Sequence, residues 1–361
     1  MPRVFNFSPG PAMLPEPVMR QVRDELLDWQ RTGMSVMELP HRGDKFRELA
    51  AQAEQDLRDL LNIPEHYTVL FMPGGATSQF AMIPMNLLED RKTTAYVQTG
   101  VWSRKAVVEA KKYSNVVISS DSEGNNFTTI AEQHTWDVPD DAAYLYYADN
   151  ETVNGIEFPY VPNVGDIPLV CDMSSNLLSR PVDVTKYGLI YATAQKNMGP
   201  AGLTTVIIRD DLLQRKPHLL TPSTFRYDLY AKEKSMPNTP VTFAWYVAGL
   251  VFQWAKKEGG LVEMAERCER RSCKLNEFID QSAFYNNPVD PIYRSRINVI
   301  FRLADDSLEA TFLKDAEKGG LTNLKGHRFI GGMRASMYNS MPEIGVDTLI
   351  AFMRDFESQY G

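Results

Sequence analysis

The segment Leu189-Ile-Tyr-Ala-Thr-Ala-Gln-Lys-Asn-Met-Gly-Pro-Ala-Gly202 joins a short apolar run to a lysine and a glycine-containing loop. Leu189–Thr193 is apolar on both faces, which is typical of a strand in a buried, mostly parallel sheet. Lys196 follows this run after Ala194 and Gln195, at the edge where open parallel sheets bind their ligands. The segment therefore predicts a buried strand that brings a lysine to the ligand-binding edge of a sheet.

Six further apolar runs have the same character, and stretches of helical length or loop composition separate them. They are Thr68–Met72, Thr94–Gln98, Asn115–Ser119, Tyr144–Tyr147, Pro168–Cys171 and Thr204–Ile208. Helical spacing of apolar residues marks Glu16–Trp29 and Asp44–Leu61 as helices. This alternation predicts an α/β fold, with a mostly parallel seven-stranded sheet flanked by helices.

A change in composition at Lys256–Gly260 ends this region. Beyond it the sequence predicts an amphipathic helix, two strands with a helix between them, and a C-terminal helix. The first helix is expected at Leu261–Ile279 and the strands at Asn298–Leu303 and Gly331–Met337. We expect a large domain over residues 16–258 and a smaller α+β domain formed by residues 1–15 and 259–361.

Composition excludes several classes of protein. The 361 residues carry 38 basic and 46 acidic side chains, a net charge of −8, which argues against nucleic acid or an anionic membrane as a partner. Three scattered cysteines predict neither a disulfide framework nor a metal site. The proline-broken N-terminus does not resemble a signal peptide, and no apolar run approaches about 18 residues. We expect a cytoplasmic protein.

Two further motifs follow predicted strands. Met72-Pro-Gly-Gly-Ala-Thr-Ser-Gln79 leads from a strand into a helix, where glycines and a helix N-terminus can cradle a phosphate. Asp172 closes the run Pro168–Cys171 and faces the same edge of the sheet. Taken singly, the loop also reads as a plain glycine turn, Asp172 as a helix cap and Lys196 as a solvated loop lysine.

Together these three features indicate one chemistry. A pyridoxal phosphate enzyme needs a loop that anchors the phosphate, an acid that keeps the pyridine nitrogen protonated, and a lysine that forms a Schiff base. Burial and a neighbouring cationic ring lower the pKa of such a lysine, so that it reacts as a neutral amine.

Longer segments make the chain resemble the fold-type I pyridoxal phosphate enzymes, specifically the class V aminotransferases and, among them, the phosphoserine aminotransferase family. The matching segments run from end to end: residues 6–15, 35–42, 74–79, 191–202, 236–240, 242–246, 324–328 and 331–336.

The resemblance implies a role for each matching residue. Lys196 forms the Schiff base, and Asp172 pairs with the pyridine nitrogen. The remaining cofactor contacts are Ala76, Thr77, Trp102, Thr152 and Gln195, with Asn238 and Thr239 reaching across from a partner subunit. Arg334 takes the α-carboxylate of the substrate, and the distal anion falls to His41, Arg42, His327 and Arg328. Some relatives have an arginine where Thr77 stands, which implies weaker or water-mediated phosphate contacts here.

The activity implied is that of a homodimeric transaminase. L-Glutamate would donate its amino group, and 3-phosphohydroxypyruvate would accept it to give O-phospho-L-serine. A longer acceptor, 3-hydroxy-2-oxo-4-phosphobutanoate, would serve pyridoxine synthesis. The alternatives are alanine–glyoxylate transamination, cysteine desulfuration, a non-catalytic pyridoxal phosphate carrier, and a nicotinamide-dependent dehydrogenase. The sequence lacks the glycine fingerprint of a nicotinamide-dependent dehydrogenase, since no G-x-G-x-x-G occurs.

Overall fold

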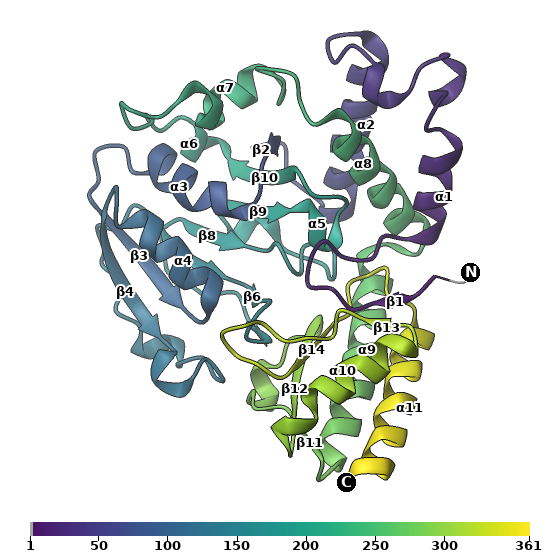
Figure 1. The fold of residues 1–361 in the computed structure, drawn as a ribbon. Helices are drawn as coiled ribbons and strands as arrows, with labels where there is room; N and C mark the ends of the chain where they lie inside the picture. The colour runs from purple at the N-terminus through teal and green to yellow at the C-terminus, as the bar shows by residue number, and fades with distance from the viewer. Residues whose placement is uncertain (1–2) are drawn as a thin grey trace.

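A seven-stranded sheet with helices on both faces forms the larger part of the computed structural model, which describes residues 3–361 (Figure 1). Its strands are β2 (Tyr67–Pro73), β3 (Thr93–Gln98), β4 (Asn115–Asp121), β5 (Leu145–Ala148), β8 (Leu169–Asp172), β9 (Leu189–Thr193) and β10 (Leu203–Arg209). The strand order is β2-β10-β9-β8-β5-β3-β4. Only β10 runs antiparallel to its neighbours. All seven predicted strands are confirmed, each to within two residues.

Helices cover the two faces of this sheet because its strands are apolar on both sides. They are α1 (Glu16–Asp24), α2 (Asp44–Leu61), α3 (Ala76–Leu87), α4 (Val101–Ala110), α5 (Ala194–Asn197), α6 (Asp210–Leu213), α7 (Tyr227–Lys232) and α8 (Thr242–Lys257). Along β2, Phe71 packs toward Trp245 of α8, with ring centroids 4.7 Å apart, whereas Met72 joins the core cluster that contains Phe80 of α3. The period-2 alternation of the strand thus supplies two cores.

The second part of the chain forms a smaller three-stranded antiparallel sheet with three helices. Its elements are β11 (Tyr285–Asn286), β12 (Asn298–Leu303), β14 (Met333–Ser336), α9 (Gly260–Gln281), α10 (Glu309–Lys318) and α11 (Glu343–Tyr360). Near the N-terminus β1 (Phe5–Asn6) pairs in parallel with β13 (Leu321–Thr322). Phe7 is fully buried in the core of this part. That packing supports the proposed division into residues 16–258 and the rest, which stays a prediction.

One predicted helix is shorter than expected. The helix predicted over Glu16–Trp29 ends at Asp24, and Trp29 opens the 3₁₀ turn η1 (Trp29–Arg31). Here the Asp28 carboxylate accepts a hydrogen bond of 2.7 Å from Gly33 N, and Trp29 N donates to Met34 O. This closed loop buries Trp29, so the apolar residues keep a helical spacing up to Trp29 although the helix itself ends at Asp24.

Seven more 3₁₀ turns lie in connecting segments. They are η2 (Val36–Glu38), η3 (Glu123–Asn125), η4 (Gln133–Thr135), η5 (Val184–Lys186), η6 (Ser223–Phe225), η7 (Pro291–Tyr293) and η8 (Asp306–Leu308).

No helix within residues 3–361 combines the length and apolar character needed to cross a membrane.

A short hairpin joins the two parts of the molecule. Its strands β6 (Asn150–Glu151) and β7 (Ile156–Glu157) follow β5 at the carboxyl edge of the large sheet. Glu157 is buried and accepts a hydrogen bond of 2.6 Å from Arg296, which precedes β12 of the small sheet. The hairpin therefore fixes the small sheet against the carboxyl edge of the large one.

We expect Gly155→Ala in this hairpin to destabilise the protein more than Gly165→Ala. Both glycines have positive φ, +69° and +62°, where an L-residue costs roughly 1–2 kcal/mol. A Cβ at Gly155 would lie 2.9 Å from the carbonyl oxygen of Asn298, whereas nothing lies within 4 Å at Gly165. Thermal unfolding of both variants checks this expectation. Equal melting temperatures would contradict the close approach of hairpin and small sheet.

Candidate active site

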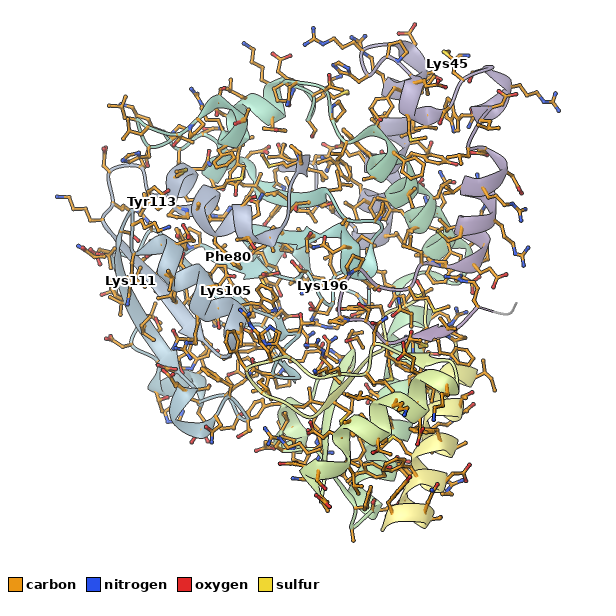
Figure 2. All side chains as sticks on the ribbon, in the orientation of Figure 1. Lys45, Phe80, Lys105, Lys111, Tyr113 and Lys196 are labelled. Carbon is orange, nitrogen blue, oxygen red and sulfur yellow. The ribbon has the colours of Figure 1, made fainter. Side chains whose placement is uncertain are left out.

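Loops from five strand ends meet at the carboxyl edge of the large sheet. Figure 2 shows Lys196 near the middle of the molecule, where this edge faces the smaller part of the chain. β9 leads to Lys196, β8 ends at Asp172, and β5 leads into the hairpin that carries Thr152. The loop after β2 and the start of α4 after β3 complete the group. The edge of the sheet that was predicted to bind a ligand is thus where the motifs converge.

Lys196 is half-buried on α5 and makes no ion pair among residues 3–361. Its Nζ donates hydrogen bonds to the hydroxyls of Thr152, at 2.6 Å, and Ser175, at 3.0 Å. Burial lowers the pKa of Lys196 to about 8, although the charges of Asp172 and Glu151 oppose this shift. A lysine with this pKa is neutral for a larger fraction of the time at pH 7 than an ordinary lysine, so it is a better nucleophile and base.

Asp172 is a buried carboxylate held by neutral donors. It accepts hydrogen bonds of 2.8 Å from Ser174 N and 2.8 Å from the Tyr191 hydroxyl, which in turn lies 2.9 Å from the hydroxyl of Tyr146. No salt bridge to Asp172 occurs within residues 3–361. Because an unpaired buried carboxylate is costly, this arrangement fits a site for a cationic ligand group.

The loop after β2 opens α3 without a side-chain cap. Gly74 adopts a φ of +107°, which glycine tolerates, and its N–H donates to the carbonyl of Gly202. Gly75 approaches Thr193, whose hydroxyl bonds to the side chain of Gln195. The first amides of α3 therefore lie beside the Lys196 loop with no cap of their own, an arrangement that suits a phosphate.

Trp102 presents its ring to the same space. Lys196 Nζ lies 5.4 Å from the ring centroid, and Lys105 Nζ lies 4.5 Å from it. The indole Nε1 of Trp102 is buried without a hydrogen-bond partner in the described part of the chain. An aromatic face, an uncapped helix, an unpaired carboxylate and a nucleophilic lysine together fit pyridoxal phosphate, which is flat, anionic at its phosphate and basic at its ring nitrogen.

Cationic side chains from the small part line the other side. Arg334 on β14 is 5% exposed; its Nη1 donates to the carbonyl of Thr152 at 3.3 Å, and its Nε has no partner among residues 3–361. His327 and Arg328 lie in the loop between β13 and β14. Burial lowers the pKa of His327, and three nearby cations add to the effect: Arg334, Lys105 and Arg328. This cluster suits an anionic substrate.

Four predicted site residues make no hydrogen bond or ion pair with Lys196 among residues 3–361. Arg42 lines a separate cavity of about 860 Å³ together with Trp245. Lys45, at the start of α2 just beyond His41 and Arg42, lies far from Lys196 in Figure 2. Asn238 and Thr239 are exposed in the loop between α7 and α8. Asn238 and Thr239 are the two that were predicted to act from a partner subunit, and the roles of all four residues stay predictions.

Three residues of the site were not predicted. Ser175 bonds to Lys196, Tyr191 bonds to Asp172, and Glu151 binds the first turn of α4. Tyr191 lies opposite Asp172 in the β8–β9 register. The Ser-Ser pair after Met173 was visible in the sequence, but the register that gives Tyr191 its role is set only when the sheet forms.

Comparison with known proteins identifies the family. The model of the family "Aminotransferase class-V" matches residues 4–349. The chain belongs to the class-V aminotransferases. A phosphoserine aminotransferase of Coxiella burnetii is 58% identical to it over 361 residues, which is 100% of both chains. At that identity the chain belongs, among the class-V aminotransferases, to the phosphoserine aminotransferase family.

Solved structures agree with this membership. The phosphoserine aminotransferase from Bacillus circulans subsp. alkalophilus superposes with a TM-score of 0.97 at 42% identity, covering 99% of each chain. A pyridoxal phosphate-bound phosphoserine aminotransferase from Trichomonas vaginalis gives a TM-score of 0.94 at 40% identity, covering 98% of this chain and 100% of that one. The predicted fold class and the predicted family of this class-V aminotransferase are both confirmed.

Proposed function

We propose that this class-V aminotransferase uses pyridoxal phosphate to transfer the amino group of L-glutamate to 3-phosphohydroxypyruvate, giving O-phospho-L-serine and 2-oxoglutarate in serine biosynthesis. The observation that carries the proposal is Lys196, held by two neutral hydroxyls beside an unpaired aspartate and an uncapped helix. The 58% identity to a phosphoserine aminotransferase supports the choice of substrates. The acceptor of pyridoxine synthesis, 3-hydroxy-2-oxo-4-phosphobutanoate, has the same charged groups and is proposed as a second substrate.

When bound, pyridoxal phosphate supplies an aldehyde that condenses with amines and a ring that withdraws electrons from the substrate Cα. The first amides of α3, with Gln195, are proposed to hold its phosphate. Asp172 would keep a proton on the ring nitrogen, because the Tyr191 hydroxyl and Ser174 N hold this carboxylate in place. The other proposed contacts of this chain are Ala76 and Thr77 in the α3 turn, Trp102 at the ring face and Thr152 at the ring hydroxyl.

Lys196 is proposed as the group that moves the proton. In the first half-reaction its Nζ would take the proton from Cα of L-glutamate and pass it to the cofactor carbon that receives the amino group, and in the second it would return a proton from that carbon to Cα of the keto acid. A base must be neutral to accept a proton, and a pKa of about 8 keeps part of Lys196 neutral near pH 7. Thr152 and Ser175 orient Nζ through uncharged hydroxyls, which do not favour its ammonium form as a carboxylate partner would.

Replacing Lys196 with alanine is expected to lower amino transfer from glutamate by several orders of magnitude, because the covalent link and the proton carrier are lost together. Lys186→Ala, which removes an exposed lysine from η5 of the same part of the chain, is the matched control and should keep the wild-type rate. The measurement is formation of 2-oxoglutarate with 3-phosphohydroxypyruvate as acceptor. Turnover by Lys196→Ala at the rate of the control would refute the role of Lys196.

Arg334 is proposed to bind the α-carboxylate, which all substrates share, whereas His327 and Arg328 bind the distal anion. Arg334→Ala should therefore reduce kcat/KM for glutamate and phosphoserine alike. Arg328→Ala should reduce kcat/KM more for phosphoserine, because a dianion loses more than a monoanion when a cationic contact is removed. A charge-assisted contact is worth ~1.5–3 kcal/mol, or roughly ten- to a hundredfold.

The same measurements separate the proposed substrates from those of alanine–glyoxylate transamination. Wild-type enzyme should use unphosphorylated serine and alanine poorly, since neither offers a distal anion to the cations of the site. If serine or alanine matched phosphoserine in kcat/KM, the phosphoserine assignment would be wrong.

The enzyme is proposed to act as a homodimer in which Asn238 and Thr239 of one chain complete the cofactor site of the other, joined by His41 and Arg42 at the substrate. Within one chain Asn238 and Thr239 are exposed, and Arg42 lines a cavity that does not include Lys196. Both observations support this arrangement. We also propose the cytoplasm as its location, because all three cysteines are free thiols, as in most proteins of reducing compartments.

Mixing two inactive variants tests the shared site. Lys196→Ala and a variant carrying Asn238→Ala with Thr239→Ala should each be nearly inactive at a cofactor concentration that only just saturates the wild type. In mixed dimers one of the two sites has both sets of residues intact. Refolding the variants together should restore about a quarter of wild-type activity if chains pair at random. No recovery from a mixture shown to contain mixed dimers would contradict the shared site.

A further inference from the structure

The first turn of α4, which carries Trp102, is capped by a carboxylate from another element. Glu151, on β6, accepts hydrogen bonds from Trp102 N at 3.0 Å, from Ser103 N at 2.8 Å and from the Ser103 hydroxyl at 2.7 Å. A helix N-terminus normally takes its cap from the residue just before it. Here that residue is Gly100, which has no side chain, so a residue about fifty positions later in the chain performs the capping.

The hairpin packs closely against the start of α4. A Cβ at Gly100 would lie 2.5 Å from Cδ of Glu151 and 2.7 Å from the Asn154 side-chain oxygen, so only glycine leaves room for the carboxylate. Asn154, from the same hairpin, accepts a further hydrogen bond of 3.2 Å from Val101 N. The hairpin therefore holds the start of α4 at several points, and Glu151 makes the most contacts.

Glu151 is fully buried and has no basic partner in a salt bridge within residues 3–361. Burial raises the pKa of this carboxyl, while the hydrogen bonds from Ser103 and Trp102 oppose the rise. Neutral serine or asparagine side chains cap helices well. A carboxylate is favoured at a helix N-terminus by the helix dipole, and unlike a neutral cap it also brings a negative charge to its surroundings.

Glu151 is joined by one peptide bond to Thr152, whose hydroxyl accepts the hydrogen bond from Lys196. Two consecutive residues thus hold the two sides of the site: Glu151 the backbone of Trp102, and Thr152 the amine of Lys196. The Trp102 ring and Lys196 Nζ are 5.4 Å apart as a result. Any shift of Glu151 moves the aromatic face relative to the reacting amine.

We propose that Glu151 is a positioning residue for Lys196: its carboxylate anchors the Trp102 turn opposite the reacting amine, and its negative charge opposes the loss of a proton from that amine. This rests on the proposed function only in taking Lys196 as the reacting lysine. The charges that act on the pKa of Lys196 are those of Asp172 from β8 and Glu151 from β6, which raise it, and of Arg334 from β14, which lowers it. Of the two acids, Glu151 is the one that touches the turn of Trp102.

The test uses the full-length, cofactor-free protein and measures the rate at which an amine-acylating reagent labels Lys196, by peptide mass spectrometry, as a function of pH. Wild-type labelling should rise with a midpoint near the pKa of about 8. Because a carboxylate favours the ammonium form, Glu151→Gln should move the midpoint to lower pH. A fall of half a unit would raise the labelling rate at pH 7 about threefold.

Ser103→Ala is the matched control, because it removes one hydrogen bond to Glu151 and keeps the charge. Its midpoint should equal that of the wild type. An unchanged midpoint in folded Glu151→Gln, or an equal shift in Ser103→Ala, would overturn the proposal.

If Glu151→Gln does not fold, Glu151→Asp is the variant that tests the proposal. It keeps the charge but shortens the reach, so the labelling midpoint should stay while the emission of Trp102, isolated by subtracting the spectrum of Trp102→Phe, should change. An unaltered Trp102 emission would refute the anchoring role. Neither measurement requires turnover, so a failure here leaves the transaminase proposal standing. If the wild-type protein could not transfer the amino group of glutamate, the transaminase proposal would be refuted, but the labelling and emission results would still test the role of Glu151.

Discussion

The hydrogen bonds from Lys196 to the hydroxyls of Thr152 and Ser175 are the contacts on which the rest of the structure depends. A lysine largely removed from water normally has a carboxylate partner, which would keep it charged and unreactive. Neutral hydroxyls orient the amine without this effect, but they must come from two different strand ends, β5 and β8. The large sheet supplies these ends side by side, and the hairpin after β5 fixes them against the small sheet.

That hairpin gives the site its second set of connections. The carbonyl of Thr152 accepts a hydrogen bond from Arg334, so the residue that contacts the reacting amine also contacts the proposed carboxylate-binding arginine. Glu151, next to it, holds the turn of Trp102. Reacting amine, aromatic face and anion-binding cation are therefore positioned by two consecutive residues, which explains why the hairpin is fully buried although it is a connection.

The sequence allowed most of this architecture to be predicted. All seven strands of the large sheet were found because both of their faces are apolar, and Lys196, Asp172 and the loop before α3 were found because they follow strands. Trp29 misled the prediction of the first helix because a closed loop buries it. Tyr191 and Glu151 were missed because their roles depend on strand register and on a contact with a distant helix. The roles proposed for Asn238 and Arg42 stay predictions, because they concern contacts with a second chain.

The most direct test of the account is the absorption spectrum of the protein carrying pyridoxal phosphate, recorded during each half-reaction. L-Glutamate alone should abolish the visible band of the bound cofactor, because the amino group passes to it, and 3-phosphohydroxypyruvate should then restore the band. The same additions to Lys196→Ala should produce neither change at a comparable rate. A wild-type spectrum that glutamate leaves unaltered would contradict the claim that these strand ends form a transaminase site.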